Sequence, residues 1–515
     1  MACRVTNYRA NSVVHYPLAL LCGVCDVGDN PSSVSVVNLS SEFPGDFSSW
    51  PVVSGKFKVF VQLVHGRNDL LLKHGSAVET FSLFFEPVLC HQQRYIRLVY
   101  ITCCDAPEQG HFQGPEDEDC SIESACSRIG LGMLILQTAL AETLVASGMG
   151  YKSFCLEHTE KKSIPIVHVF KSKLHYDMAR VMTGEDIWSH VATELMNSEL
   201  RDGDRCKFVA FLSWTRYQAD VVEAVTHSEV LSRMSGHVMV GAGGLALCGT
   251  GCLYTWARNV EELPLRLYDT RQVDRLHFMD DSNYRGTLSA CYSSSLGGVL
   301  HEMGHTFDLG HTREGIMGHG FHDICHVYTV SNCEADTVWD NFSSPVQSTV
   351  NVESIPESAA EPRRIRLTTL KPKGQPGCMA GQKHCASLSG ARWSRSCAII
   401  LSHHLWLNVR RRSNIVGSVQ LLGEHLLTSP HGICLVEFRR PEDAMVIGFW
   451  EFSSGAEEVC IDPKKLRLVY LSESEDSLEP DQHSKNDTSS LLIFAIDMAG
   501  NTFTKFVDLV QGEAE

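Results

Sequence analysis

The stretch that decides the fold runs from Ser295 to His311 and reads SLGGVLHEMGHTFDLGH. His301 and His305 stand four residues apart, so a helix would place both imidazoles on one face, with Glu302 directly after the first. Apolar residues recur at helical spacing on a different face, at Leu296, Leu300, Met303 and Phe307. We therefore predict a helix that buries one stripe and presents the two histidines elsewhere.

A third histidine, His311, stands six residues after His305, and Met317 stands six residues after His311. Three neutral imidazoles leave the fourth tetrahedral position of Zn²⁺ to a water molecule, which is the catalytic arrangement and not the structural one. A bare His-Glu-x-x-His arises by chance much more often than the same motif with a third histidine at a fixed spacing. The extended motif is therefore a specific indication of a catalytic metal site.

The motif from His301 to His311, followed by Met317, resembles that of the metzincin zinc metalloproteases. The block through Gly320 is similar to a sparsely characterised family of eukaryotic metallopeptidases. The resemblance implies that His301, His305 and His311 bind zinc and that Glu302 is the general base. It also implies that Met317 lies in a methionine turn beneath the metal.

Asp308 departs from the metzincin pattern, which has glycine where the chain leaves the helix to bring round the third ligand. Glycine tolerates a left-handed backbone at such a turn. Aspartate can also visit that conformation, and Gly310 could supply the reversal instead. A further alternative replaces His311 as the third ligand by a downstream carboxylate such as Glu334.

Two other segments have a functional and a structural interpretation. His319 stands where some metzincins place a tyrosine, so it could donate a hydrogen bond to a developing oxyanion, or it could be a surface or second-layer histidine. Residues Met239 to Cys252 resemble in position the edge strand on which metzincins pair extended substrates, and the alternative is a glycine-rich structural turn.

The pattern of apolar runs and turn residues divides the chain into four parts. Short apolar runs between turn clusters in residues 1–92 predict a β-sandwich-like domain. Strands alternate with helices in residues 93–342, which predicts an α/β layer architecture and, by the resemblance, a metzincin-like zinc peptidase domain. Residues 343–390 are predicted to be an exposed, irregular linker. Apolar runs typical of β-strands in residues 391–515 predict a C-terminal β-sandwich-like domain. The expected fold class is multidomain α/β plus β.

The elements that support this division are the strands Tyr95–Thr102, Ile164–Val169 and Lys207–Trp214, a helix from Ser121 to Ser147, and a helix that begins after Thr183. In the last part, strands are expected at Gly432–Phe438, Ala444–Phe452, Leu466–Leu471 and Leu491–Ile496.

Composition limits the classes of partner. The 515 residues contain 44 Lys and Arg against 61 Asp and Glu, a formal net charge of −17, which disfavours nucleic acid and anionic membranes. The apolar run Ile129 to Leu140 is too short to span a bilayer and predicts a buried helix. The 20 cysteines show no disulfide framework, so Cys22 and Cys25 are predicted to be buried structural thiols. We expect a cytoplasmic protein with reduced thiols, secretion being the alternative, and leave the oligomeric state open.

These features predict a zinc-dependent metallopeptidase, an endopeptidase, that acts on peptide or protein substrates through a zinc-activated water with Glu302 as general base. The alternative is a catalytically silent zinc domain in a protein that binds partners through its β-domains. The intact Glu302 argues against that alternative, because a silent site has no chemical need for a base.

Overall fold

The computed structural model describes residues 3–25, 33–41, 48–88, 94–106, 110–158, 164–330, 366–367, 390–408, 417–423, 425–461 and 490–508. The chain divides into two compact units. The first contains the described residues up to Leu309, then 314–330 and 390–392. The second contains Gly310–Arg313, residues 366–367 and the described residues from Trp393 onward. The boundaries predicted at residues 92, 342 and 390 remain predictions.

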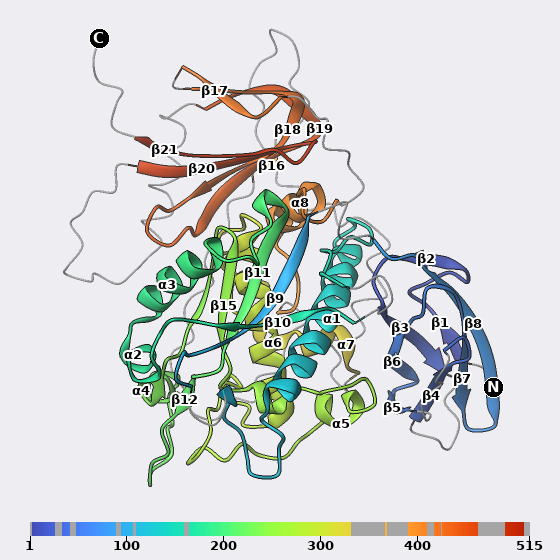
Figure 1. Cartoon of the computed structure of the whole chain (residues 1–515). Coiled ribbons are helices and arrows are strands. Elements are labelled where there is room, and N and C mark those ends of the chain that lie inside the picture. Colours follow the sequence, from blue (N-terminus) through green and yellow to red (C-terminus); the bar gives the residue numbers. More distant parts are fainter. Residues whose placement is uncertain are drawn as a thin grey trace. The chain divides into compact units, whose positions relative to one another are not determined.

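The first unit begins with a curled sheet of eight strands in the order β1-β3-β6-β5-β4-β7-β8-β2 (Figure 1). β5 pairs with both β4 and β6 and so joins the two halves of the sheet. Along β4 and β7, buried and partly exposed residues alternate, as expected for strands with one covered face. The strands are β1 (Cys3–Val5), β2 (Ser12–Val14), β3 (Leu18–Cys25), β4 (Ser33–Asn38), β5 (Ser48–Val53), β6 (Lys56–Gln62), β7 (Gly66–His74) and β8 (Ala77–Phe85).

The prediction that Cys25 is a free thiol is wrong. Cys3 and Cys25 are joined by a disulfide, with their Cα atoms 4.3 Å apart. The antiparallel register of β1 and β3 places the two residues directly opposite each other, a pairing that sequence spacing does not reveal. Cys22, by contrast, is a free, half-buried thiol.

The centre of the first unit is a mixed α/β structure around a five-stranded sheet in the order β10-β9-β11-β15-β14. Its first four strands are parallel, while β14 runs antiparallel to β15 and forms the edge. Both β9 and β11 are almost continuously buried, as expected for parallel strands covered on both faces. The strands are β9 (Tyr95–Thr102), β10 (Val167–Lys171), β11 (Cys206–Leu212), β14 (Met239–Ala242) and β15 (Leu245–Gly249).

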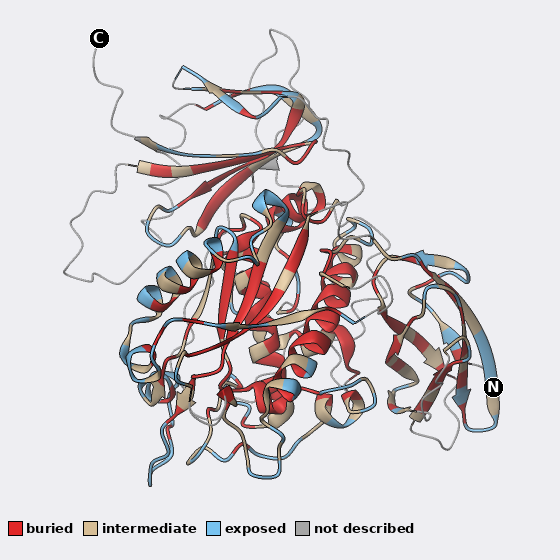
Figure 2. Cartoon of the chain, viewed as in Figure 1, coloured by how far each residue is buried: buried red, intermediate tan, exposed pale blue. Residues whose placement is uncertain are grey.

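Helices cover the two faces of this sheet (Figure 1). Helix α3 (Gly184–Met196) packs Ile187, Val191 and Leu195 against one face and has Thr183 as its N-cap, as the sequence predicts. Helix α1 (Ile122–Ala146) contacts β9 and β10, and α6 (Leu288–Thr306) contacts β14 and β15. Figure 2 shows that the strands and the inner sides of these helices are the most buried part of the unit.

Helix α1 is long and apolar enough to cross a membrane by length and composition, but 83% of its most apolar window is buried inside the protein. The predicted buried helix at Ile129–Leu140 is therefore confirmed. The shorter elements of the unit are α2 (Tyr176–Val181), β12 (Arg216–Tyr217), α4 (His227–Ser232), β13 (Met234–Ser235), α5 (Leu263–Leu267) and α7 (Cys325–Tyr328).

The second unit contains one sheet in the order β16-β19-β18-β20-β21, with β17 paired to β18. Its core contains Ile433, Val436 and Phe438 from β18. The elements are β16 (Arg366–Leu367), α8 (Arg395–His403), β17 (Gln420–Leu422), β18 (Leu426–Arg439), β19 (Val446–Cys460), β20 (Ser490–Asp497) and β21 (Thr502–Asp508). The predicted strand Leu466–Leu471 and nearly all of the predicted linker lie outside the described residues.

Candidate metal and catalytic site

Helix α6 carries His301 and His305 on one face, as predicted. The Nδ1 atom of His301 lies 2.8 Å from the carbonyl oxygen of Ile316, and that of His305 lies 3.0 Å from the carbonyl oxygen of Leu309. A carbonyl oxygen only accepts hydrogen bonds, so each Nδ1 carries the proton and donates it. In the neutral rings, each Nε2 is then left with a lone pair.

The two Nε2 atoms lie 3.2 Å apart. Two lone pairs at this separation repel unless a cation lies between them. Tetrahedral Zn²⁺ with Zn–N distances of about 2.05 Å would hold two imidazole nitrogens about 3.3 Å apart. Backbone carbonyls that accept from the other ring nitrogen are also the usual support of a metal-binding histidine. The donor set on α6 therefore fits a divalent metal ion.

The helix ends at Thr306 through a turn that Asp308 makes possible. Asp308 has φ of 63°, in the left-handed region, whereas Gly310 does not have a positive φ. The N–H of Leu309 donates to the carbonyl of Gly304, and that of Asp308 donates to the carbonyl of His305. This is the Schellman pattern of a helix C-terminus. Of the two residues that could reverse the chain, Asp308 is the one that does so.

His311 follows Leu309 after a single residue, so the covalent chain keeps it close to the end of α6. One ring nitrogen from each of His301, His305 and His311 lies within 4.8 Å of the others. The Nδ1 atom of His311 donates to the carbonyl oxygen of Asp443 at 2.6 Å, so its Nε2 also has a lone pair. The backbone of His311 is bridged to Met445 through hydrogen bonds with Ala444 and Val446.

Met317 is almost fully buried and packs under α6. Gly304 is the residue at the contact, because a Cβ there would overlap the sulfur of Met317. The carbonyl of the preceding residue, Ile316, accepts the hydrogen bond from His301. The segment Ile316–Met317 therefore packs against α6 and also orients the ring of His301.

Glu302 is held by the edge strand β14. Its Oε2 accepts a hydrogen bond from the N–H of Gly241 at 2.6 Å. Burial raises the pKa of the Glu302 carboxyl to about 7, while this hydrogen bond acts in the opposite direction. Strand and helix approach so closely here that a Cβ on Gly241 would overlap the backbone carbonyl of Glu302.

Lys207 is a supporting residue that the sequence analysis missed. Its Nζ donates to the carbonyl of Gly243 at 3.0 Å and to the carbonyl of Thr306 at the end of α6. It thus ties the hairpin of β14 and β15 to the helix that carries the histidines. Burial lowers the pKa of this amine, and the nearby Asp308 opposes that shift. A lone lysine at the start of a strand gave no signal by which this role could be predicted.

The remaining predicted positions are less closely associated with the cluster. His319 is exposed, and its ring stacks with that of His322 at a centroid distance of 6.5 Å. Among the described residues it is not grouped with the three histidines. The segment Met239–Cys252 contains β14, and its position as the antiparallel edge strand is confirmed. Glu334 lies outside the described residues.

Comparisons with known proteins add to this geometry. A family model described as "Putative peptidase family" matches residues 2–354. "Putative zinc metalloproteinase YIL108W" of Saccharomyces cerevisiae is 22% identical over 346 residues, which is 61% of this chain and 47% of that protein. "Putative zinc metalloproteinase C607.06c" of Schizosaccharomyces pombe is 20% identical over 329 residues, which is 61% of this chain and 50% of that protein. The chain thus spans about half the length of the curated relatives it matches.

Among solved structures, wild-type OgpA from Akkermansia muciniphila aligns with a TM-score of 0.39 and 11% identity, over 81% of this chain and 93% of that chain. A catalytically inactive OgpA in complex with an O-glycopeptide aligns with a TM-score of 0.40 and 12% identity, over 81% and 92%. These scores are too low to assign a common fold.

Proposed function

Because the chain belongs to the family described as "Putative peptidase family", we propose that it is a zinc-dependent metallopeptidase of the metzincin type whose active site is the cluster on α6. The observation that carries the proposal is the pair of lone-pair nitrogens, 3.2 Å apart, on His301 and His305, with Glu302 between them in the chain. The two yeast relatives, which are named zinc metalloproteinases, support zinc as the ion.

His301, His305 and His311 would hold the metal through Nε2, because each Nδ1 is engaged with a backbone carbonyl. Zn²⁺ bound there supplies Lewis-acid chemistry, lowering the pKa of a bound water and polarising a peptide carbonyl. Met317 would act as the methionine-turn residue, since it packs against α6 below the histidines. To donate a hydrogen bond to the substrate oxyanion, the exposed ring of His319 would have to turn toward the metal site.

Glu302 would be the general base that takes the proton of the attacking water and passes it to the departing amine. The Gly241 hydrogen bond occupies one of its oxygens and fixes the carboxyl group, which leaves the other oxygen for proton transfer. Its raised pKa suits a group that must both accept and release a proton near neutral pH.

The substrate would lie along β14. In the β14–β15 ladder the pairs Val238–Gly249 and Val240–Leu247 alternate with Met239–Cys248 and Gly241–Ala246. The backbone groups of Met239 and the carbonyl of Gly241 therefore point away from β15, toward the free edge, while the N–H of Gly241 donates to Glu302. An extended peptide could pair with the edge through its main chain, a mode that suits an endopeptidase with internal cleavage sites.

The test is Glu302→Gln, which keeps the size and one acceptor of the side chain and removes the base. We expect the variant to bind zinc as the wild type does and to lose about 10²- to 10⁴-fold in peptide turnover. Glu123→Gln, at an exposed position in the first turn of α1, is the matched control and should keep full activity. A peptide library digested with and without a chelator provides the readout. Full turnover by Glu302→Gln, or turnover unaffected by chelation, would contradict the proposal, whereas zinc binding without any turnover by the wild type would favour a silent zinc domain.

A further inference from the structure

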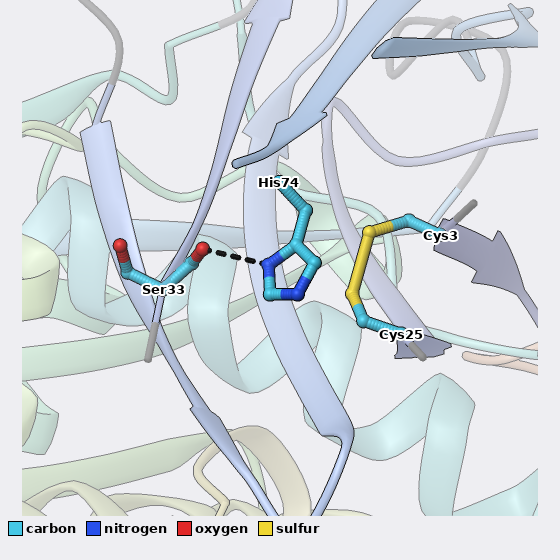
Figure 3. Close-up of a disulfide and its surroundings, with 4 residues drawn as sticks. All are labelled: Cys3, Cys25, Ser33 and His74. Atoms are coloured by element: carbon cyan, nitrogen blue, oxygen red, sulfur yellow. Dashed lines mark hydrogen bonds between the residues drawn. A yellow bond between two sulfur atoms is a disulfide. The ribbon is translucent and has the colours of Figure 1, made fainter. Parts of the chain in front are cut away.

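A second group of metal-ligand atoms lies in the N-terminal sheet, apart from α6. Cys3 on β1 and Cys25 on β3 face each other in the antiparallel register and form the disulfide (Figure 3). His74, the last residue of β7, comes from the other half of the curled sheet. All three side chains are buried, and their sulfur and ring nitrogen atoms lie within 4.8 Å of one another.

The orientation of His74 is fixed by its backbone partner. Its Nδ1 lies 2.9 Å from the carbonyl oxygen of Ser33, so Nδ1 carries the proton and Nε2 has the lone pair. Figure 3 shows the ring between Ser33 and the two sulfur atoms. A disulfide has no proton to offer this lone pair, whereas two thiols or a thiolate-bound metal would satisfy it.

The geometry points to a metal site: when their disulfide is reduced, Cys3 and Cys25 bind, together with His74, a thiophilic d¹⁰ metal ion, Zn²⁺ or Cu⁺. Two thiolates and one imidazole form a donor set that selects these ions over hard cations. The Ser33 carbonyl supports the ring as such carbonyls support metal-binding histidines generally. The site would link β1 and β3 to β7, so bound metal would stabilise the sheet against unfolding.

The disulfide and the metal are alternative occupants of the same two sulfurs. A disulfide oxidant such as oxidised glutathione would convert the metal-bound pair into the observed disulfide. In that step, the Cys3–Cys25 bond forms, the two thiolates give up two electrons, and the metal ion is released. The oxidant takes both electrons and two protons from solvent as its own S–S bond breaks, and becomes two thiols.

The test uses the full-length protein and Co²⁺ as a spectroscopic probe. Cobalt bound by thiolates gives a charge-transfer absorption that cobalt bound by histidines alone lacks, so the cluster on α6 does not contribute to it. After reduction with a phosphine, we expect the wild type to bind one equivalent of Co²⁺ per chain with this absorption. Treatment with oxidised glutathione should abolish the absorption and release that equivalent. Competition with Zn²⁺ in one arm and Cu⁺ in another then identifies the preferred ion.

The variants assign the ligands. Cys3→Ser should lose the thiolate absorption, and His74→Phe should weaken Co²⁺ binding by about 10-fold or more. Cys22→Ser, a free cysteine on the same strand as Cys25, is the matched control and should behave as the wild type. Absence of the absorption in the reduced wild type, or its persistence in Cys3→Ser, would overturn the inference. The wild-type measurement requires no variant to fold, and none of these results depends on peptidase activity.

Discussion

The histidine cluster on α6 and the cluster of Cys3, Cys25 and His74 in the N-terminal sheet orient their imidazoles in the same way but assemble their ligands differently. In both, Nδ1 donates to a backbone carbonyl and Nε2 faces the other ligand atoms. On α6, a single helix places two ligands four residues apart. In the sheet, three strands from both halves each contribute one residue. The helical cluster therefore needs only local structure for its first two ligands, while the sheet cluster needs the whole sheet to have formed.

This difference determines which substitutions each cluster tolerates. The cluster on α6 depends on how closely β14 approaches the helix, and the N-terminal sheet depends on polar contacts with α1. Variants of Gly241 and Glu142 test these two dependences, and variants of Asp308 test the turn that ends α6.

The largest effect is expected at Gly241. Gly241→Val would force β14 away from α6, because even a Cβ overlaps the carbonyl of Glu302, and the carboxyl would lose its backbone donor. We expect about a 10³-fold loss of peptide turnover with zinc still bound, measured on the folded variant. Gly244→Ala is the control, since a Cβ at Gly244 meets nothing within 4 Å. Equal losses in the two variants would show that the close approach has no special role.

An intermediate effect is expected at Glu142 of α1, whose Oε1 accepts from the hydroxyl of Tyr8 at 2.9 Å and from the amide of Asn7 at 3.2 Å. Burial raises the pKa of this carboxyl from 4.5 to about 7. The folded state therefore keeps a proton that the unfolded state loses above about pH 4.5. The free energy of unfolding should fall as pH rises from about 4.5 to about 7 and then level off.

Glu142→Gln should remove this slope, because the amide does not titrate. We expect the variant to equal the wild type near pH 4 and to exceed it by about 3 kcal/mol at pH 8, measured by urea denaturation. Glu142→Ala, which lacks the acceptor, should be less stable than Glu142→Gln at every pH. A Gln variant that follows the wild-type slope would assign the pH dependence to other groups.

The smallest effect is expected at Asp308, whose φ of 63° permits the Schellman turn. Asp308→Gly should keep zinc and change the free energy of unfolding by no more than about 0.5 kcal/mol, because glycine adopts this conformation freely but loses the attraction to Lys207. Asp308→Val should be less stable than the glycine variant by about 1 kcal/mol or more. Thermal unfolding of the pair provides the comparison, and equal stabilities would contradict a role for the left-handed backbone.

Local patterns predicted most of the elements around the site. The strand Tyr95–Thr102 and the helix that carries His301 and His305 are as expected, because the apolar pattern within each segment agrees with its burial in the structure. Backbone preference alone predicts that either Asp308 or Gly310 reverses the chain after the helix, and the structure shows that Asp308 does so. Contacts between segments were not predictable. Neither the hydrogen bond from Gly241 to Glu302 nor the hydrogen bonds of Lys207 correspond to a periodic pattern in the sequence. The pairing of Cys3 with Cys25 was missed for the same reason, since strand register is set by the whole sheet.

The bridge between His311 and Met445 has a consequence for biosynthesis. On the ribosome, His301 and His305 are translated long before Ala444 and Val446, the residues that hydrogen-bond to the backbone of His311. The nascent chain therefore possesses its helical histidine pair while the third histidine still lacks its anchor. The peptidase activity proposed above would therefore await the synthesis of this anchor, so the nascent chain and its neighbours would not be cleaved before Val446 has been made.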